Sequence, residues 1–222
     1  MNAVETSMPK DFAEGERGFA FAGGVTDYRR RTFALLRSLI ASTGGVATAL
    51  DIGAGDGWMA KSLMAAGLLG TCTPVDVKRR SHVVLEPLLY DGERLPFDDS
   101  SIDLCYAVDA VHHAADPSRL LRDMARVSRR FIVLKDHRYE SRAGAWVLRI
   151  LDEIGNRRFS IGSPGHYQRG SAWLDLLRAE GFVVRTLIHP APCHVGLLGL
   201  TNRLQFVALF ERCESDGRNP SR

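Results

Sequence analysis

ALDIGAGDGW, residues 49–58, is the stretch that decides the fold of this chain. A short apolar run ends there in a group of glycines and acids, and a helical pattern begins directly afterwards. The stretch therefore predicts a strand, a tight turn and the start of a helix. Glycine in such a turn permits positive φ and lets a ligand approach the main-chain amides, because no Cβ stands in the way. In doubly wound α/β sheets, nucleotide-like cofactors bind at this kind of turn.

The spacing within this turn separates two classes of cofactor. The dinucleotide fingerprint requires a third glycine three positions after the second, where it lets the helix pack closely on the strand. Trp58 occupies that position here. The spacing is instead GxGxG after the acid Asp51, which resembles motif I of the class I S-adenosylmethionine-dependent methyltransferases. S-adenosylmethionine has no pyrophosphate, and it carries an ammonium group that a carboxylate can hold.

Length and composition limit the remaining possibilities. A chain of 222 residues is long enough for one α/β domain, and a net charge of +3 is too small to indicate a nucleic-acid partner. The four cysteines show no CxxC spacing, so we expect reduced thiols in a cytoplasmic protein. No long uncharged apolar run is present, and the first 18 residues carry acids where a signal peptide would be apolar. We therefore expect no membrane span.

A second stretch, DGERLPFDDSSIDL at residues 91–104, makes the resemblance more specific. Together with VDAVHH at 108–113 it resembles the type 11, ubiquinone-biosynthesis-like group of these methyltransferases. The resemblance covers residues 47–212 and is strongest over 49–113. It implies that the Asp91 carboxylate takes the adenine amino group and that the Gly92 amide meets a ring nitrogen. The resemblance places the remaining cofactor contacts at Gly53, Ala54, Gly55, Val77 and Val108.

Asp76 is a further candidate for holding the cofactor. It ends the second predicted strand, CTPVDV at residues 72–77, after the glycine-rich turn. A carboxylate at this place in a doubly wound sheet accepts both ribose hydroxyls. The other interpretation is a loop aspartate followed by the solvated run 78–80.

The order of the predicted elements indicates a single α/β domain. Strands alternate with helices from residue 47 onwards, and the resemblance implies a Rossmann-like, doubly wound sheet of seven strands. The expected strand order is 3-2-1-4-5-7-6, with the last strand antiparallel and helices on both faces. We expect a flexible arm over residues 1–24, the domain over 25–212 with a lid insertion at about 138–170, and a disordered tail over 213–222.

Several polar side chains are candidates for acting on the methyl acceptor. The fifth strand ends in KDHRYE, residues 135–140, at the edge where open α/β sheets bind ligands. His137, His166 and His112 are the candidate general bases, with Asp136 as the group that orients His137. Candidate substrate contacts are Tyr28, His113, Asp136 and Tyr167. For each histidine the alternative is a satisfied structural residue.

The predicted activity is transfer of a methyl group from S-adenosylmethionine to a small-molecule acceptor, which leaves S-adenosylhomocysteine. The transfer is an in-line displacement at oxygen or carbon, for which no metal is obligatory. The sequence lacks the Asn/Asp-Pro-Pro-Tyr/Phe segment of amino-methylating nucleic-acid enzymes. Alternatives are a non-catalytic binding protein with this fold, an RNA methyltransferase that uses the basic runs at 29–31 and 78–80, and a nicotinamide-dependent oxidoreductase. The sequence does not determine the oligomeric state.

Overall fold

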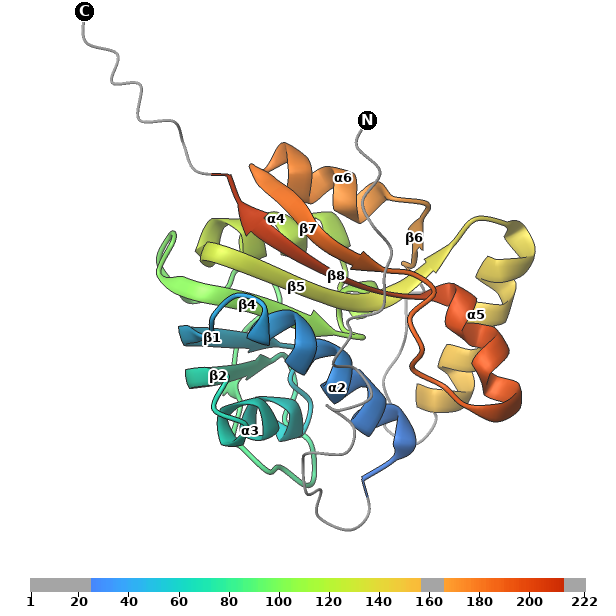
Figure 1. Ribbon diagram of the computed structural model, residues 1–222, viewed down its shortest axis with the longest axis horizontal. Helices are drawn as coiled ribbons and strands as arrows, with labels where there is room; N and C mark the ends of the chain where they lie inside the picture. The colour runs from blue at the N-terminus through green and yellow to red at the C-terminus, as the bar shows by residue number, and fades with distance from the viewer. Residues whose placement is uncertain (1–24, 157–165, 214–222) are drawn as a thin grey trace, which may run out of the picture.

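The structure, a computed structural model, describes residues 25–156 and 166–213 of the chain (Figure 1). Its helices are α2 (Asp27–Ala41), α3 (Trp58–Ala65), α4 (Pro117–Val127), α5 (Arg142–Asn156) and α6 (Ala172–Ala179), with 3-10 helices η1 (Val111–His113) and η2 (Gly196–Leu204). Its strands are β1 (Val46–Ile52), β2 (Leu69–Asp76), β3 (Leu88–Leu89), β4 (Ile102–Val108), β5 (Ser128–Tyr139), β6 (Gln168–Arg169), β7 (Phe182–Ile188) and β8 (Gln205–Arg212).

One twisted sheet carries the fold, with strands in the order β3-β2-β1-β4-β5-β8-β7 (Figure 1). Strands β3, β2, β1, β4 and β5 are parallel, whereas β8 runs antiparallel to both β5 and β7. The short β6 pairs only with β5 within the described sheet, through Arg138 and Gln168. Because β6 is counted, the expected sixth and seventh strands are β7 and β8 here. The expected order and the antiparallel last strand are therefore confirmed.

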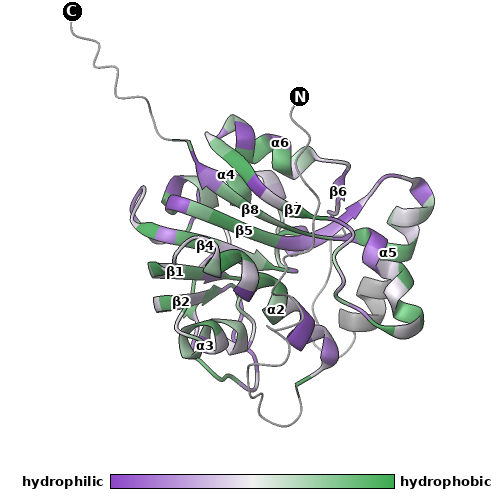
Figure 2. Ribbon diagram, in the orientation of Figure 1, coloured by the Kyte–Doolittle hydropathy of each residue, from purple (hydrophilic) through white to green (hydrophobic). Residues whose placement is uncertain are grey.

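Successive side chains of a strand point to opposite faces of the sheet, so those of the central strands alternate between two hydrophobic cores. Ala49 and Leu104 are paired in register on the face that α2 and α3 cover. Their neighbours Leu50 and Cys105 lie on the opposite face, against α4 and α6. The central strands are accordingly hydrophobic over most of their length, and β5 becomes hydrophilic towards its carboxyl end (Figure 2).

Helix starts follow the capping residues that the sequence contains. The Thr26 hydroxyl accepts a hydrogen bond from the Arg29 amide at the start of α2. Asp116 caps α4 in the same way, with Pro117 in the first turn. The two helices pack on opposite faces of the sheet.

Two strands show how pairing sets strand length. The third strand is only Leu88–Leu89, because most of the stretch from Val83 to Tyr90 follows an irregular path. The fifth strand runs through Lys135 and His137 to Tyr139, because β8 continues to pair with it as far as His137. The predicted polar cluster at the end of this strand therefore lies largely on the strand itself.

Some expectations fall outside the described residues. These are the arm at 1–24, residues 157–165 of the lid insertion and residues 214–222 of the tail. All four cysteines are described and form no disulfide; Cys213 is exposed and the other three are buried. Within residues 25–156 and 166–213, no helix has the length and apolar character needed to cross a membrane.

Candidate functional site

The glycine-rich turn after β1 requires glycine for different reasons at different positions. Gly53, Gly55 and Gly57 all have positive φ, between 62° and 72°. A Cβ on Gly53 would lie 2.4 Å from the Ala110 Cβ, and one on Gly57 would lie 2.4 Å from the Leu85 carbonyl oxygen. A Cβ on Gly55 would meet no atom closer than 3.9 Å, so only the backbone conformation disfavours a side chain there. The chain thus packs against both ends of the turn and leaves its middle open.

Asp76, at the end of β2, holds this turn in place. Its Oδ2 accepts a hydrogen bond of 2.8 Å from the Gly55 amide, and its Oδ1 accepts one of 3.2 Å from the Lys78 amide. The amides of Gly53 and Ala54 donate to the Val75 carbonyl oxygen at 2.9 and 3.1 Å. The Asp76 carboxylate is 8% exposed and lies beside the open part of the turn.

Val77 and Gly92 bring the next two loops together at the same edge. A Cβ on Gly92 would lie 3.1 Å from Val77 Cγ1, and Val77 itself is 60% exposed. Asp91 Oδ1 accepts hydrogen bonds from the amides of Glu93 at 2.8 Å and Arg94 at 3.3 Å. These amides are the main reason that the pKa of Asp91 lies below its ordinary value. Asp91 is therefore an ionised carboxylate at the rim of this edge.

Asp51 is a buried acid inside the first strand. It is 2% exposed, and its Oδ2 has no hydrogen-bond partner among the residues that the structure describes. Burial raises the pKa of Asp51 to about 7, and the charges of Asp76 and Asp56 add to this while a hydrogen bond from Tyr106 opposes it. A buried, unsatisfied carboxylate oxygen is costly unless a cationic or hydrogen-bonding group meets it.

Helix α2 lies across the glycine turn and is anchored there by two side chains. Arg29 donates to Asp56 Oδ2 at 2.8 Å, and its guanidinium lies 5.4 Å from the centre of the Trp58 ring. Tyr28 reaches further along the sheet edge, where its hydroxyl contacts Asp109 and Lys135. The N-terminal end of α2 therefore covers the carboxyl ends of β1, β4 and β5.

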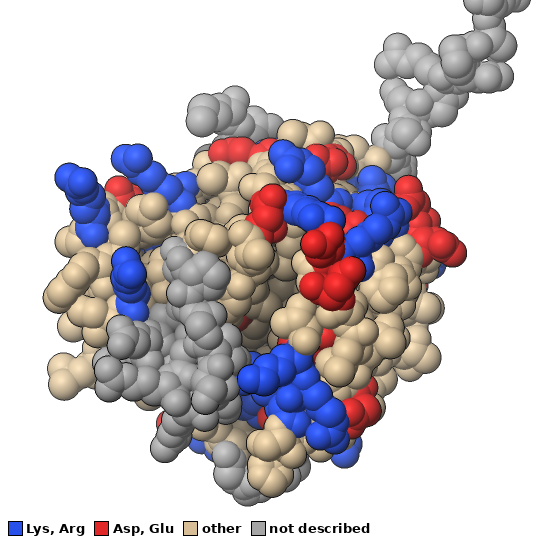
Figure 3. Space-filling model, turned by 180° about the vertical axis from the view of Figure 1, so that it is seen from behind, with Lys and Arg blue, Asp and Glu red and all other residues tan. Residues whose placement is uncertain are grey.

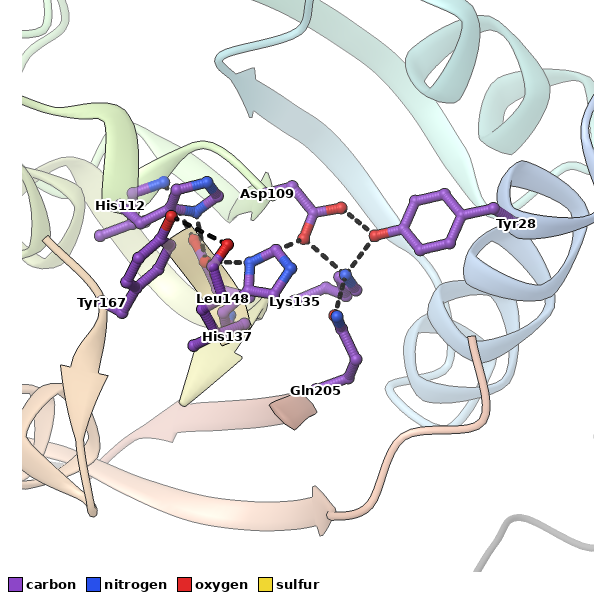
Figure 4. A network of polar contacts seen from close by, with 10 residues as sticks. Tyr28, Asp109, His112, Lys135, His137, Leu148, Tyr167 and Gln205 are labelled. Carbon is purple, nitrogen blue, oxygen red and sulfur yellow. Dashed lines mark hydrogen bonds and ion pairs between the residues drawn. The ribbon is translucent and has the colours of Figure 1, made fainter. Parts of the chain in front are cut away.

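Lys135 is the centre of a buried polar network that the sequence analysis did not single out (Figure 4). It is 0% exposed, and its ammonium donates to Tyr28, to Asp109 and to Gln205 Oε1, the last at 2.6 Å. Burial alone would lower the pKa of Lys135, but the Asp109 carboxylate holds it above its ordinary value. Burial also favours the neutral form of Asp109, yet Lys135 and then His137 keep its pKa below the ordinary value. The pair is therefore an ion pair between a fully buried ammonium and a carboxylate whose side chain is 22% exposed.

Asp109 also carries backbone strain at this position. Its φ is +50°, an uncommon conformation for a residue other than glycine. Its amide donates to the Lys135 carbonyl oxygen at 2.8 Å, which holds the turn after β4 against β5. Such outliers persist where the surrounding structure enforces them, and they cluster at functional sites.

Asp136 gathers two of the predicted histidines. His112 Nδ1 lies 2.5 Å from Asp136 Oδ1, and His137 Nδ1 lies 3.3 Å from the same oxygen. Asp136 Oδ2 accepts from the Val111 amide at 3.1 Å. Burial opposes ionisation of Asp136, but His112 and then His137 lower its pKa. His112 and Asp136 are buried, while the His137 side chain is 16% exposed.

Tyr167 and His113 pack on this imidazole pair, whereas His166 lies apart from it. The Tyr167 ring centre is 5.3 Å from that of His112 and 6.0 Å from that of His137 (Figure 4). The rings of His112 and His113 are 4.0 Å apart. His166 is exposed, and its Nδ1 lies 3.1 Å from the Ala114 carbonyl oxygen.

The site residues that the sequence analysis missed are Asp109, Lys135 and Gln205. Lys135 directly follows the apolar run 131–134. This was a usable signal, because a lysine that is buried in a strand requires an anionic partner. Nothing in the sequence identifies that partner, since Asp109 and Gln205 are 26 and 70 positions away.

Comparison with known proteins agrees with this geometry. Residues 50–130 match the family model described as "Methyltransferase domain". A protein of Mycolicibacterium gilvum named as an uncharacterized methyltransferase is 31% identical over 113 residues, which cover 44% of this chain and 43% of that protein. One of Mycolicibacterium vanbaalenii is 33% identical over 91 residues, covering 37% of this chain and 35% of that protein. The chain thus spans less than half the length of these curated relatives.

Solved structures share the fold at low sequence identity. An S-adenosylmethionine-dependent methyltransferase from Mesorhizobium loti superposes with a TM-score of 0.61 at 14% identity, over 89% of this chain and 100% of that one. Magnesium protoporphyrin IX methyltransferase from Synechocystis, solved with bound S-adenosylhomocysteine, gives 0.57 at 16% identity, over 91% and 94%. The family model and the curated relatives show that residues 50–130 are similar to a methyltransferase domain, and the solved structures show that the chain shares their fold.

Proposed function

We propose that this protein binds S-adenosylmethionine at the carboxyl edge of the sheet and transfers the methyl group to a small-molecule acceptor by in-line displacement. One observation carries the proposal: the open middle of the glycine turn contacts the Asp76 carboxylate, and the buried Asp51 carboxylate lies close enough to feel the charge of Asp76. Asp91 belongs to the same edge, because the amide of the preceding Tyr90 donates to the Asp76 carbonyl oxygen. The catalytic unit is the single domain over residues 25–212, and the described parts of the insertion at about 138–170, residues 138–156 and 166–170, would lie on the acceptor side.

The residues present fit this cofactor. Asp51 Oδ2 is a buried acceptor without a partner among the described residues, which suits the methionine ammonium. Asp76 accepts one amide on each oxygen, and a carboxylate oxygen has a second lone pair for a ribose hydroxyl. Asp91 uses Oδ1 for both amides and keeps Oδ2 for an amino donor such as that of adenine. The exposed side chain of Val77, in contact with Gly92, offers an apolar surface for the base.

The chain's own residues would align the reactants and exclude water. When bound, S-adenosylmethionine supplies a methyl group that is already activated as a sulfonium. Helix α2, held by Arg29 and Tyr28, covers the turn, and alignment of this kind supplies much of the rate of a displacement reaction. Ala54 and Val108 complete the cofactor side of the proposed site. Tyr28, His113 and Tyr167 are the proposed acceptor contacts on the other side.

The imidazole pair on Asp136 supports an acceptor that loses a proton. A hydroxyl acceptor must give up its proton as the methyl group arrives, and removing it through a positioned side chain is worth about 10²- to 10⁴-fold in rate. The Nδ1 atoms of His112 and His137 both contact the Asp136 carboxylate, and His137 is partly exposed. We therefore place activation of the acceptor at this pair and favour oxygen over carbon. His166 is a secondary candidate, because its contact with Ala114 holds its ring elsewhere.

The basic runs give little support to an RNA acceptor. Arg29 and Arg30 pair with Asp56 and Asp27, and Arg79 pairs with Glu86. On the face seen in Figure 3, lysines and arginines stand in separate groups with acids among them. Nucleic-acid binding relies on basic side chains that neutralise phosphates, so charges already paired contribute less.

Calorimetric titration with S-adenosylmethionine, S-adenosylhomocysteine and NAD is the first test. We expect micromolar binding of the first two and none of NAD, and we expect Gly55→Val to abolish binding while the fold persists. In a second arm, S-adenosylmethionine labelled at its methyl group is incubated with a cell extract divided into small molecules and RNA. Label in the small-molecule fraction supports the proposal. Binding of NAD alone, or label in RNA alone, would overturn it.

A further inference from the structure

Two histidines and one aspartate converge at the ends of η1 and β5. A hydrogen bond between His112 and Asp136 would not by itself require the second histidine to lie so close. One ring nitrogen each of His112 and His137 and one oxygen of Asp136 lie within 4.8 Å of one another. We propose that His112, Asp136 and His137 bind one divalent transition-metal ion, such as Zn²⁺. The sequence analysis expected no metal, because methyl transfer does not require one.

The distances are close to those of a metal centre. Bonds of about 2.0 to 2.2 Å from zinc to nitrogen or oxygen place neighbouring ligand atoms about 3 to 3.5 Å apart. The observed separations from Asp136 Oδ1 are 2.5 Å to His112 Nδ1 and 3.3 Å to His137 Nδ1. Side-chain rotations that move the ligand atoms by less than about 1 Å would make room for an ion bound by imidazole nitrogen and carboxylate oxygen.

His137 supports an ion better than it supports a hydrogen bond. Its Nδ1 lies 3.3 Å from Asp136 Oδ1 and 3.7 Å from Asp109 Oδ1, which leaves it between two acceptors without a good bond to either. Hydrogen bonds from nitrogen to oxygen are normally 2.7 to 3.2 Å long, so about 3.3 Å lies beyond that range. A cation between these groups would give the ring a definite partner.

Buried charge points in the same direction. Asp109 and Asp136 are two carboxylates at this edge, and the buried Lys135 ammonium pairs with Asp109. Asp136 is 0% exposed, and its hydrogen-bond partners among the described residues are imidazoles and main-chain amides. A buried carboxylate needs positive charge close to it, from an imidazolium or from a metal ion. The main-chain amides of Val111 and His137 already orient the carboxylate, as outer partners do in metal sites.

Three protein ligands leave at least one coordination position for an exogenous oxygen. A two-histidine, one-carboxylate set with an open position is the composition of catalytic rather than closed structural metal sites. If the proposed function holds, the ion would bind the oxygen of a hydroxyl acceptor and lower its pKa, so that its proton leaves to solvent through the partly exposed His137 side. This role depends on the proposed function, whereas metal binding does not.

The test is a titration of the chelator-treated full chain with Co²⁺ and Zn²⁺ in the absence of S-adenosylmethionine. We expect one equivalent of Co²⁺ to give visible ligand-field absorption and Zn²⁺ to displace it. His137→Gln and Asp136→Asn should each weaken binding by at least about tenfold. His82→Gln is the matched control, because it removes an exposed imidazole elsewhere.

Two results would overturn the site. One is binding that His82→Gln removes and His137→Gln leaves unchanged. The other is a wild-type protein that binds no equivalent of either ion, in which case the imidazoles share protons with Asp136. S-adenosylmethionine affinity is measured on the same samples. A wild-type protein that binds S-adenosylmethionine but neither metal ion would refute only the metal site, and a wild-type protein that binds the metal ion but no S-adenosylmethionine would refute only the proposed function.

Discussion

Asp51 gives the sharpest prediction, because its burial links protein stability to cofactor binding. The pKa of its carboxyl is raised from 3.8 to about 7, chiefly by desolvation. Between these two values the folded protein keeps a proton that the unfolded chain releases, so stability falls as pH rises through this window. A shift of about three units corresponds to about 4 kcal/mol.

Asp51→Asn should remove this pH dependence, since asparagine resembles the protonated acid and never ionises. We expect the variant and the wild type to be similarly stable at about pH 4, and the variant to be more stable by up to about 4 kcal/mol at about pH 8. Denaturant unfolding at several pH values measures the difference. Equal slopes of stability against pH in the two proteins would refute the assignment.

Cofactor binding should show the opposite preference, because an ammonium near Asp51 favours the ionised form. Affinity of the wild type for S-adenosylhomocysteine should rise about tenfold between about pH 5.5 and pH 7, with proton release on binding. Titration in two buffers of different ionisation enthalpy counts the released protons. Asp51→Asn should bind more weakly and without this pH dependence. A wild-type affinity independent of pH would show that Asp51 does not meet the ammonium.

Four further changes test other parts of the structure. Asp76→Ala should weaken S-adenosylmethionine binding by at least about tenfold, because it removes both a ribose partner and the Gly55 anchor, and unchanged affinity by calorimetry would exclude that role. Gly53→Ala should destabilise the fold by more than about 2 kcal/mol, since its Cβ would lie 2.4 Å from Ala110 Cβ, whereas Gly67→Ala, with similar φ but open space, should lose only about 1 kcal/mol. Lys135→Met should cost about 2 to 3 kcal/mol of unfolding free energy by leaving the largely covered Asp109 carboxylate without its cation, and adding Asp109→Asn should recover part of that loss. A simple sum of the two losses would contradict the ion pair. His137→Gln should lower the rate of methyl transfer far more than His166→Gln, and equal rates for both would remove His137 from the mechanism.

The glycine turn and the sheet could be predicted because their signals are local. A strand ending in GxGxG needs no distant residue to be recognised, and the candidates Asp51 and Asp76 follow from their positions at predicted strand ends, whereas Asp91 came from the family resemblance. The strand order followed from the family resemblance, and the sheet confirms it. The short length of β3 could not be predicted, because pairing with neighbouring strands rather than local sequence sets where a strand stops.

The buried network could not be predicted for a related reason. Tyr28 and Lys135 are 107 positions apart, and only the packing of α2 across the strand ends brings them together. In the sequence, the arginine-rich start of the helix at residues 27–31 indicates a solvated helix face rather than a contact with the sheet. The convergence of His112 on Asp136 likewise depends on the turn at Asp109, whose positive φ no sequence pattern revealed.

The place of β8 in the sheet has a consequence for synthesis on the ribosome. Gln205–Arg212 inserts between β5 and β7, so the edge of β5 lacks its partner until these residues leave the exit tunnel. Until then a strand carrying Lys135 and Asp136 presents unpaired main-chain groups, a state prone to pairing with other chains. Folding of the site must therefore wait for one of the last described segments, and variants that slow β8 docking should aggregate during translation more than their equilibrium stability suggests.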